Sequence, residues 1–147
     1  MKKLSSVFYM WIGLALGILA VLMMFVPIAS YSGTTLAATH MFWGEGQSGG
    51  AWPAFVGYMF ILVGAIMTGV MALPIIQPTV KAEKIVLITS GALILVGVIL
   101  VSLITVEYSA NNGYYDYFDY FLPGYYLTLV FGLGAAGMDV VALVLDW

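Results

Sequence analysis

Four long apolar stretches constrain the fold of this chain more than any other feature of its sequence. A helix rises about 1.5 Å per residue, so it needs roughly 20 apolar residues to cross the hydrocarbon core of a bilayer. Four stretches meet this requirement, at residues 6–28, 52–76, 82–106 and 122–145. Because these runs are continuous rather than alternating, they predict transmembrane helices and not the strands of a membrane barrel.

The composition also indicates a surface that faces lipid. Hydrophobic residues make up 63% of the chain and charged residues only 7%, whereas a soluble domain carries about 25% charged residues. So few charges cannot cover a surface that is exposed to water. The sequence therefore predicts an all-α integral membrane fold, an antiparallel four-transmembrane-helix bundle that forms a single domain over residues 1–147.

The lysines predict how the bundle is oriented. Lys2 and Lys3 precede the first stretch, and Lys81 and Lys84 lie near the connection between the second and third. An even number of crossings places these two pairs on the same side, and the positive-inside rule makes that side cytoplasmic. Both termini are then expected in the cytoplasm. The two outer loops are then residues 29–51 and 107–121.

The Met-Lys-Lys start is also typical of a signal peptide, but the apolar stretch that follows is longer than a cleavable core of roughly 7–15 residues. We therefore expect an uncleaved first helix. The chain has no cysteine, which excludes disulfides, thiolate metal sites and cysteine nucleophiles. A basic set made only of lysines, together with this start, is typical of a prokaryotic protein, so we expect a multi-pass protein of the plasma (inner) membrane.

Small residues at helical spacing predict how the helices associate. Lipid gives helices no hydrophobic reason to pack, so close van der Waals contact at small residues must provide the attraction. The candidate helix-packing residues are Gly13 and Gly17 in the first stretch, Ala65 and Gly69 in the second, and Gly132 and Ala136 in the fourth. Two interpretations stay open: packing within the bundle, or docking of another subunit on one glycine face.

A polar layer is predicted in the cytoplasmic third of the fourth stretch, where Asp139 lies. A charged residue at mid-bilayer costs several kcal/mol, so such residues are usually buried and paired. A count of helical depth places Thr68, Thr89 and Ser90 in the same layer, which gives a candidate intramembrane polar cluster. Its carboxyl would fix the bundle through hydroxyls or a lysine, contact a partner subunit, or serve as a protonatable ion-coupling site.

The outer loops carry the second candidate site. Seven of the ten tyrosines lie between Tyr108 and Tyr126. Tyrosines at headgroup level are typical of an aromatic belt, but amphipathic aromatic side chains are also enriched at protein interfaces. The candidate outer recognition loop consists of Trp43, Tyr114, Tyr115, Tyr117 and Phe118.

The sequence contains no hydrolase, kinase, zinc-protease or phosphate-loop pattern, which predicts a protein that is not an enzyme and needs no metal or cofactor. The net charge of −3 does not favour a nucleic-acid partner. Four spans with cytoplasmic ends and a longer first outer loop resemble the general layout of claudin-like tetraspan proteins. That family has a Trp-Gly-Leu-Trp signature followed by a cysteine pair, whereas this chain has Phe42-Trp43-Gly44. The resemblance implies topology alone.

The leading hypothesis for function is therefore a small accessory, scaffolding or assembly subunit of a membrane complex or homo-oligomer. Its partners would be the lipid bilayer and other membrane-protein subunits, or copies of itself. A second hypothesis is a small ion- or proton-coupled transporter or channel subunit that uses Asp139. A third is an outward-facing receptor or immunity-type protein that uses the tyrosine-rich loop.

Overall fold

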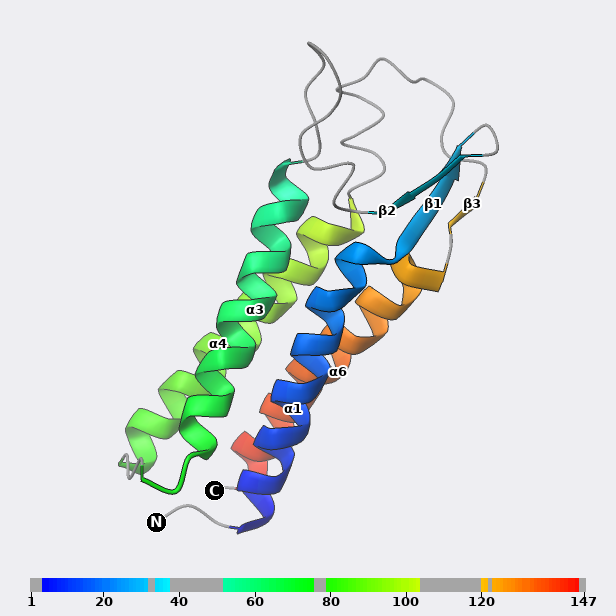
Figure 1. Ribbon diagram of the computed structural model, residues 1–147. Coiled ribbons are helices and arrows are strands. Elements are labelled where there is room, and N and C mark those ends of the chain that lie inside the picture. Colours follow the sequence, from blue (N-terminus) through cyan, green and yellow to red (C-terminus); the bar gives the residue numbers. More distant parts are fainter. Residues whose placement is uncertain are drawn as a thin grey trace.

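Four long helices dominate the structure, a computed structural model that describes residues 4–31, 34–37, 52–75, 79–103, 120–121 and 123–145 (Figure 1). The helices are α1 (Leu4–Leu22), α3 (Trp52–Ala72), α4 (Val80–Ser102) and α6 (Pro123–Leu145). All four are long and apolar enough to cross a membrane, which confirms the four predicted apolar helices and indicates a multi-pass membrane protein.

The helices form an antiparallel bundle in which α1 packs against α3 and α6, and α4 packs against the same two helices from the other side (Figure 1). Helix α1 begins and α6 ends at the same end of the bundle, where the short turn between α3 and α4 also lies. We call this the lysine end, because Lys81 and Lys84 lie in the first turns of α4. The opposite end is the sheet end.

Helix α4 begins earlier than the sequence predicted, because Thr79 caps its N-terminus. Thr79 has an extended backbone, and its hydroxyl accepts a hydrogen bond of 3.1 Å from the amide of Ala82. This bond satisfies one of the free N–H groups of the first turn. As a result Lys81 is helical rather than part of the connecting loop.

A small antiparallel sheet lies at the sheet end of the bundle (Figure 1) and adds to the predicted all-α bundle. Its strands are β1 (Pro27–Tyr31), β2 (Thr34–Ala37) and β3 (Tyr120–Phe121), in the order β2–β1–β3. The first predicted span ends early, because a short 3₁₀ turn at Met23–Phe25 follows α1 and Pro27 opens β1. Proline cannot donate to a helical ladder, and strand pairing satisfies the backbone groups beyond it. The sheet joins segments from both predicted outer loops.

The core of the bundle contains two apolar clusters. The larger lies toward the sheet end and includes Tyr58, Ile61, Ile94 and Val98, and the smaller lies toward the lysine end around Met10, Ala72, Leu87 and Ala142.

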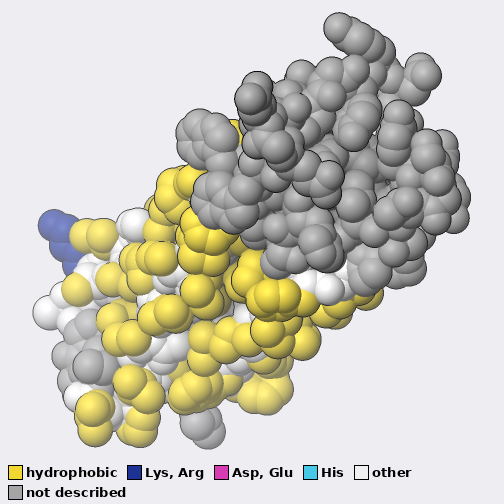
Figure 2. Space-filling view, turned by 45° about the horizontal axis from the view of Figure 1, so that its top comes forward, with side chains coloured by type: hydrophobic (Ala, Val, Ile, Leu, Met, Phe, Trp, Pro, Cys, Tyr) yellow, Lys and Arg dark blue, Asp and Glu magenta, His cyan; other side chains and the backbone are white. Residues whose placement is uncertain are grey.

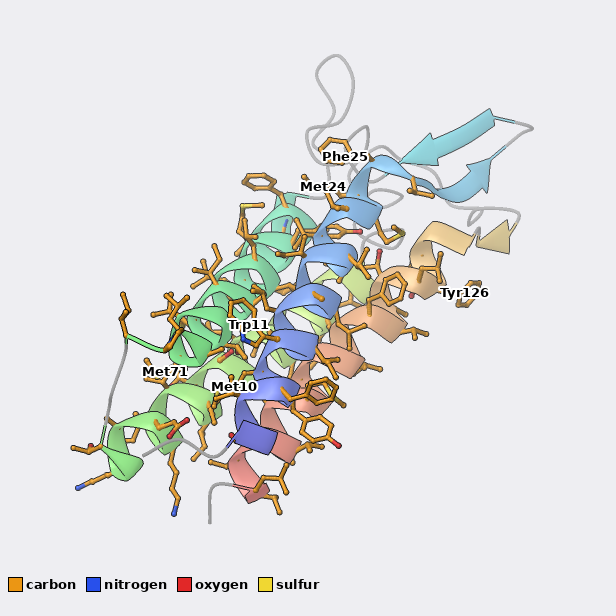
Figure 3. All side chains as sticks on the ribbon, turned by 60° about the horizontal axis from the view of Figure 1, so that its bottom comes forward. Met10, Trp11, Met24, Phe25, Met71 and Tyr126 are labelled. Atoms are coloured by element: carbon orange, nitrogen blue, oxygen red, sulfur yellow. The ribbon has the colours of Figure 1, made fainter. Side chains whose placement is uncertain are left out.

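The outward faces are apolar too. Figure 2 shows hydrophobic side chains over the described helices, with basic side chains at one end. Figure 3 shows the half-exposed Trp11 and Tyr126 projecting from α1 and α6. Contiguous apolar surface of this extent is unusual on a water-soluble monomer and is expected where lipid is the solvent.

Candidate functional site

The carboxyl group of Asp139 lies inside the bundle and joins three helices. Asp139 belongs to α6 and is only 1% exposed. The Thr68 hydroxyl of α3 donates to its Oδ1 at 2.7 Å, and Ser90 Oγ of α4 lies 2.9 Å from its Oδ2. The structure therefore brings together three members of the predicted intramembrane cluster.

Thr89 lies outside this cluster, contrary to the prediction. Its side chain is exposed, and its hydroxyl donates to the carbonyl of Ile85 in the preceding turn at 2.8 Å. Successive residues of a helix point about 100° apart, so Thr89 and Ser90 share a depth but not a face. A count of depth alone could not separate them.

Two glycines lie beside the carboxyl group. A Cβ atom built on Gly13 of α1 would lie 3.7 Å from Oδ1 of Asp139, and one built on Gly91 of α4 would lie 3.8 Å from Oδ2. Gly13 would also meet Met138 Cβ at 3.2 Å, so the α1 backbone lies close against α6. All four helices therefore contribute to the surroundings of Asp139.

The predicted packing residues lie at contacts between helices of the bundle. A Cβ on Gly17 would lie 2.5 Å from Ala65 Cβ, and one on Gly132 would lie 2.5 Å from Val98 Cγ2. Gly69 lies against the flexible side chain of Leu14. Ala136 is buried in α6 and also lines the pocket described below.

The sequence reasoning missed the Gly57–Gly97 contact, where α3 and α4 approach backbone to backbone. A Cβ on Gly57 would lie 2.7 Å from the carbonyl oxygen of Gly97, and a Cβ on Gly97 would collide with the carbonyl oxygen of Gly57. A search for paired small residues four apart within one helix does not find this contact. The residues four positions further along are Ile61 and Val101.

Glu83 was also missed, although it is buried near the lysine end. It lies on the face of α4 that carries Leu87, Ser90 and Ile94, and all of these side chains are buried. Residues that recur at spacings of three and four share one helical face. That spacing in the sequence could have predicted that Glu83 faces the interior of the bundle.

Three other polar contacts link the helices away from Asp139. The Tyr125 hydroxyl of α6 donates to the carbonyl oxygen of Ser102 of α4 at 2.9 Å, at the sheet end. The Tyr58 hydroxyl of α3 lies 3.4 Å from Thr128 Oγ1 of α6, toward the sheet end, and both side chains are buried. Ser6 of α1 donates to the carbonyl of Ala142 of α6 at 3.2 Å, near the lysine end. The bundle therefore holds polar contacts at three levels.

A pocket of about 480 Å³ lies between α4 and α6. Gly91 and Gly137 contribute to its lining, and a Cβ built on Gly137 would have no neighbouring atom within 4 Å. The exposed side chains of Ile88 and Val140 line it as well, and Asp139 contributes to its wall. We call this pocket the α4–α6 groove, and its lining is mainly apolar.

The predicted outer recognition residues lie outside the described residues, so their arrangement stays a prediction. These are Trp43, Tyr114, Tyr115, Tyr117 and Phe118. Within the described ranges, no three side chains of His, Asp or Glu are grouped so that they could hold a metal ion.

Comparison of the chain with protein-family models, with curated proteins and with solved structures finds no match in any of the three. The functional argument therefore rests on the geometry of the bundle.

Proposed function

We propose that this chain is a non-enzymatic accessory or assembly subunit of the membrane, which seats a transmembrane helix of another subunit in the α4–α6 groove. The observation that carries the proposal is the groove itself. Gly137 presents no side chain there, and the residues that would flank an incoming helix, Ile88 and Val140, are 56% and 57% exposed.

The groove has the features that favour helix association in lipid. Because lipid tails are as apolar as the side chains, helices associate through close packing at small residues. Side chains that stand on either side of a small-residue surface give ridges and grooves into which another helix fits. The lining of the α4–α6 groove combines Gly91, Ala92, Ala136 and Gly137 with larger apolar neighbours.

The arrangement of polar groups favours this function over ion or proton coupling. Buried apolar side chains, Ile61, Ile94 and Ala135, lie along the helices between the Asp139 level and the Tyr58–Thr128 contact. Asp139 and Thr128 are 11 positions apart in α6 (139 − 128), which corresponds to about 16 Å of helix. A coupled pathway needs polar groups or water along that length, whereas an interhelical clamp does not.

The orientation is part of the same proposal. Lys81 and Lys84 lie at the end of the bundle where α1 begins and α6 ends. The positive-inside rule favours the cytoplasmic face for that end.

A matched pair of leucine substitutions tests the docking function. Gly137→Leu adds a side chain within the groove, where its Cβ has no neighbouring atom within 4 Å, while Ala15→Leu adds the same side chain to an exposed position of α1. We expect native electrophoresis of mild-detergent extracts to show the wild-type chain and the Ala15→Leu variant in a complex. The Gly137→Leu variant should lose at least about tenfold of that complex, which corresponds to roughly 1.4 kcal/mol.

Two results would contradict the proposal. The first is a wild-type chain that migrates only as a monomer after gentle extraction. The second is a Gly137→Leu variant that keeps its complex at the wild-type level.

A further inference from the structure

Five oxygen atoms from three helices form a compact cluster around Asp139. They are the carbonyl oxygen of Gly64, the hydroxyl oxygens of Thr68 and Ser90, and the two carboxyl oxygens of Asp139. Ser90 Oγ lies 2.5 Å from the Gly64 oxygen, 2.6 Å from Thr68 Oγ1 and 2.9 Å from Asp139 Oδ2. Thr68 Oγ1 lies 2.7 Å from Asp139 Oδ1 and 3.1 Å from the Gly64 oxygen.

A short contact between two oxygens is favourable only with a hydrogen atom between them, its own or one shared with a second contact, and the cluster has few hydrogens. A hydroxyl brings one donor, a carbonyl brings none, and an ionised carboxylate brings none. The 2.5 Å contact between Ser90 and Gly64 takes the hydroxyl hydrogen of Ser90, because the carbonyl has no hydrogen to give. Ser90 then has only lone pairs left to face Asp139 Oδ2.

The same count applies on the other side of the carboxyl group. Thr68 has one hydrogen for its contacts with Ser90 at 2.6 Å and Asp139 Oδ1 at 2.7 Å. With an ionised Asp139, two hydroxyl hydrogens would have to serve four contacts of 2.9 Å or less, so two contacts would lack a hydrogen of their own; with a protonated Asp139, three hydrogens serve the four contacts and only one lacks its own. Two oxygens that both present lone pairs repel each other at such distances.

We infer that the cluster is a proton-binding site, in which Asp139 is a neutral carboxylic acid whose O–H donates to Ser90. Ser90 passes its own hydrogen to the Gly64 carbonyl, and Thr68 donates to the other carboxyl oxygen. The single Thr68 hydrogen is shared with Ser90 Oγ, 2.6 Å away. The bound proton adds the bond from α6 to α4, in a chain that continues from Ser90 to Gly64 of α3. A neutral acid also removes the cost of burying a charge within the hydrocarbon region.

This inference does not rest on the proposed docking function, and it concerns the chemistry of a different group. It makes the bundle a three-helix clamp in which the bond between α4 and α6 depends on one bound proton. It also leaves the Asp139 side of the α4–α6 groove uncharged.

Infrared difference spectroscopy of the full chain in lipid bilayers at neutral pH tests the inference. A neutral carboxylic acid has a C=O stretching band that a carboxylate lacks. We expect this band in the wild-type spectrum and its complete loss in Asp139→Asn. Glu83→Gln is the matched control, because it neutralises the other buried acid, and it should leave the Asp139 band in place.

Two further samples keep the test independent of how well the Asn variant folds. Carbon-13 labelling of aspartate in the wild-type chain should shift the band, and Ser90→Ala should move it to higher frequency because the acid loses its acceptor. The inference is overturned if the wild-type chain shows no such band, or if neither labelled aspartate nor Asp139→Asn changes it.

Discussion

The two long contacts made by α4 differ in kind. Against α3, Gly97 of α4 meets backbone atoms, and the Gly57–Gly97 contact allows no added side chain on either helix. Against α6, Gly132 also meets a neighbour closely, at Val98, but Gly137 further along α6 meets none, and the α4–α6 groove lies beside it. The two glycines therefore differ in effect. Gly97 allows α3 and α4 to approach closely, whereas Gly137 leaves a space between α4 and α6.

The largest expected effect is at the closed contact. In Gly97→Leu the new side chain would collide with the Gly57 carbonyl and lie against Ile61. Backbone atoms cannot move aside as a flexible side chain can, so the cost should reach or exceed about 3 kcal/mol, the upper part of the usual range for overpacking. Unfolding of the purified chain by SDS in mixed micelles measures it. A variant as stable as the wild type would show that α3 and α4 do not approach this closely.

The second largest loss of stability is expected at Asp139, where α3, α4 and α6 meet. Asp139→Ala removes the group that bonds Thr68 and Ser90, and we expect a loss of about 1–2 kcal/mol in the free energy of unfolding. Asp139→Asn retains both a donor and an acceptor, so it should lose less than half as much. The same SDS titration gives both values. Equal losses in the two variants would contradict a hydrogen-bonding role for the group.

These helices show which parts of the structure the sequence could predict. Length and hydropathy define all four spans, because the bilayer thickness sets the length that a helix needs. Depth along a helix also predicts that Asp139, Thr68 and Ser90 meet. It fails for Thr89, because depth contains no information about which face of the helix a residue occupies.

The sheet and the Gly57–Gly97 contact could not be predicted in the same way. Ala29 pairs with Phe121 far along the chain, and β3 has only two residues, too few to show an alternating pattern. Neither Gly57 nor Gly97 has a small residue four positions away in its own helix, so the meeting of the two depends on how α3 and α4 are rotated about their axes. Hydropathy does not specify that rotation. The α4–α6 groove depends on it too.

A smaller effect is expected at the Tyr58–Thr128 contact, which joins α3 to α6 toward the sheet end. The two hydroxyl oxygens are 3.4 Å apart, longer than the contacts around Asp139. Tyr58→Phe keeps the buried ring and removes the hydroxyl that makes this bond, so it should cost at most about 0.6 kcal/mol, the average for interhelical hydrogen bonds in a membrane protein. A loss larger than that of Asp139→Ala, in the same titration, would show that the main polar clamp lies at the sheet end.

The smallest effect on stability is expected at the open contact. Gly137→Leu adds the same side chain as Gly97→Leu, but its Cβ atom has no neighbour within 4 Å. The unfolding free energy should stay within about 0.5 kcal/mol of the wild type, as for substitutions away from packed sites. A strong destabilisation would mean that α4 closes against α6 at this position.

Single-cysteine labelling in lipid bilayers tests the difference between the open and the closed contacts most directly, and the cysteine-free chain suits the method. We predict that a cysteine in Gly137→Cys reacts with a membrane-soluble maleimide and resists a membrane-impermeant one, while Ala65→Cys, fully buried, resists both. Reaction of Gly137→Cys with the impermeant reagent would contradict its place within the bilayer. Protection of the purified Gly137→Cys chain from both reagents would contradict an open groove between α4 and α6.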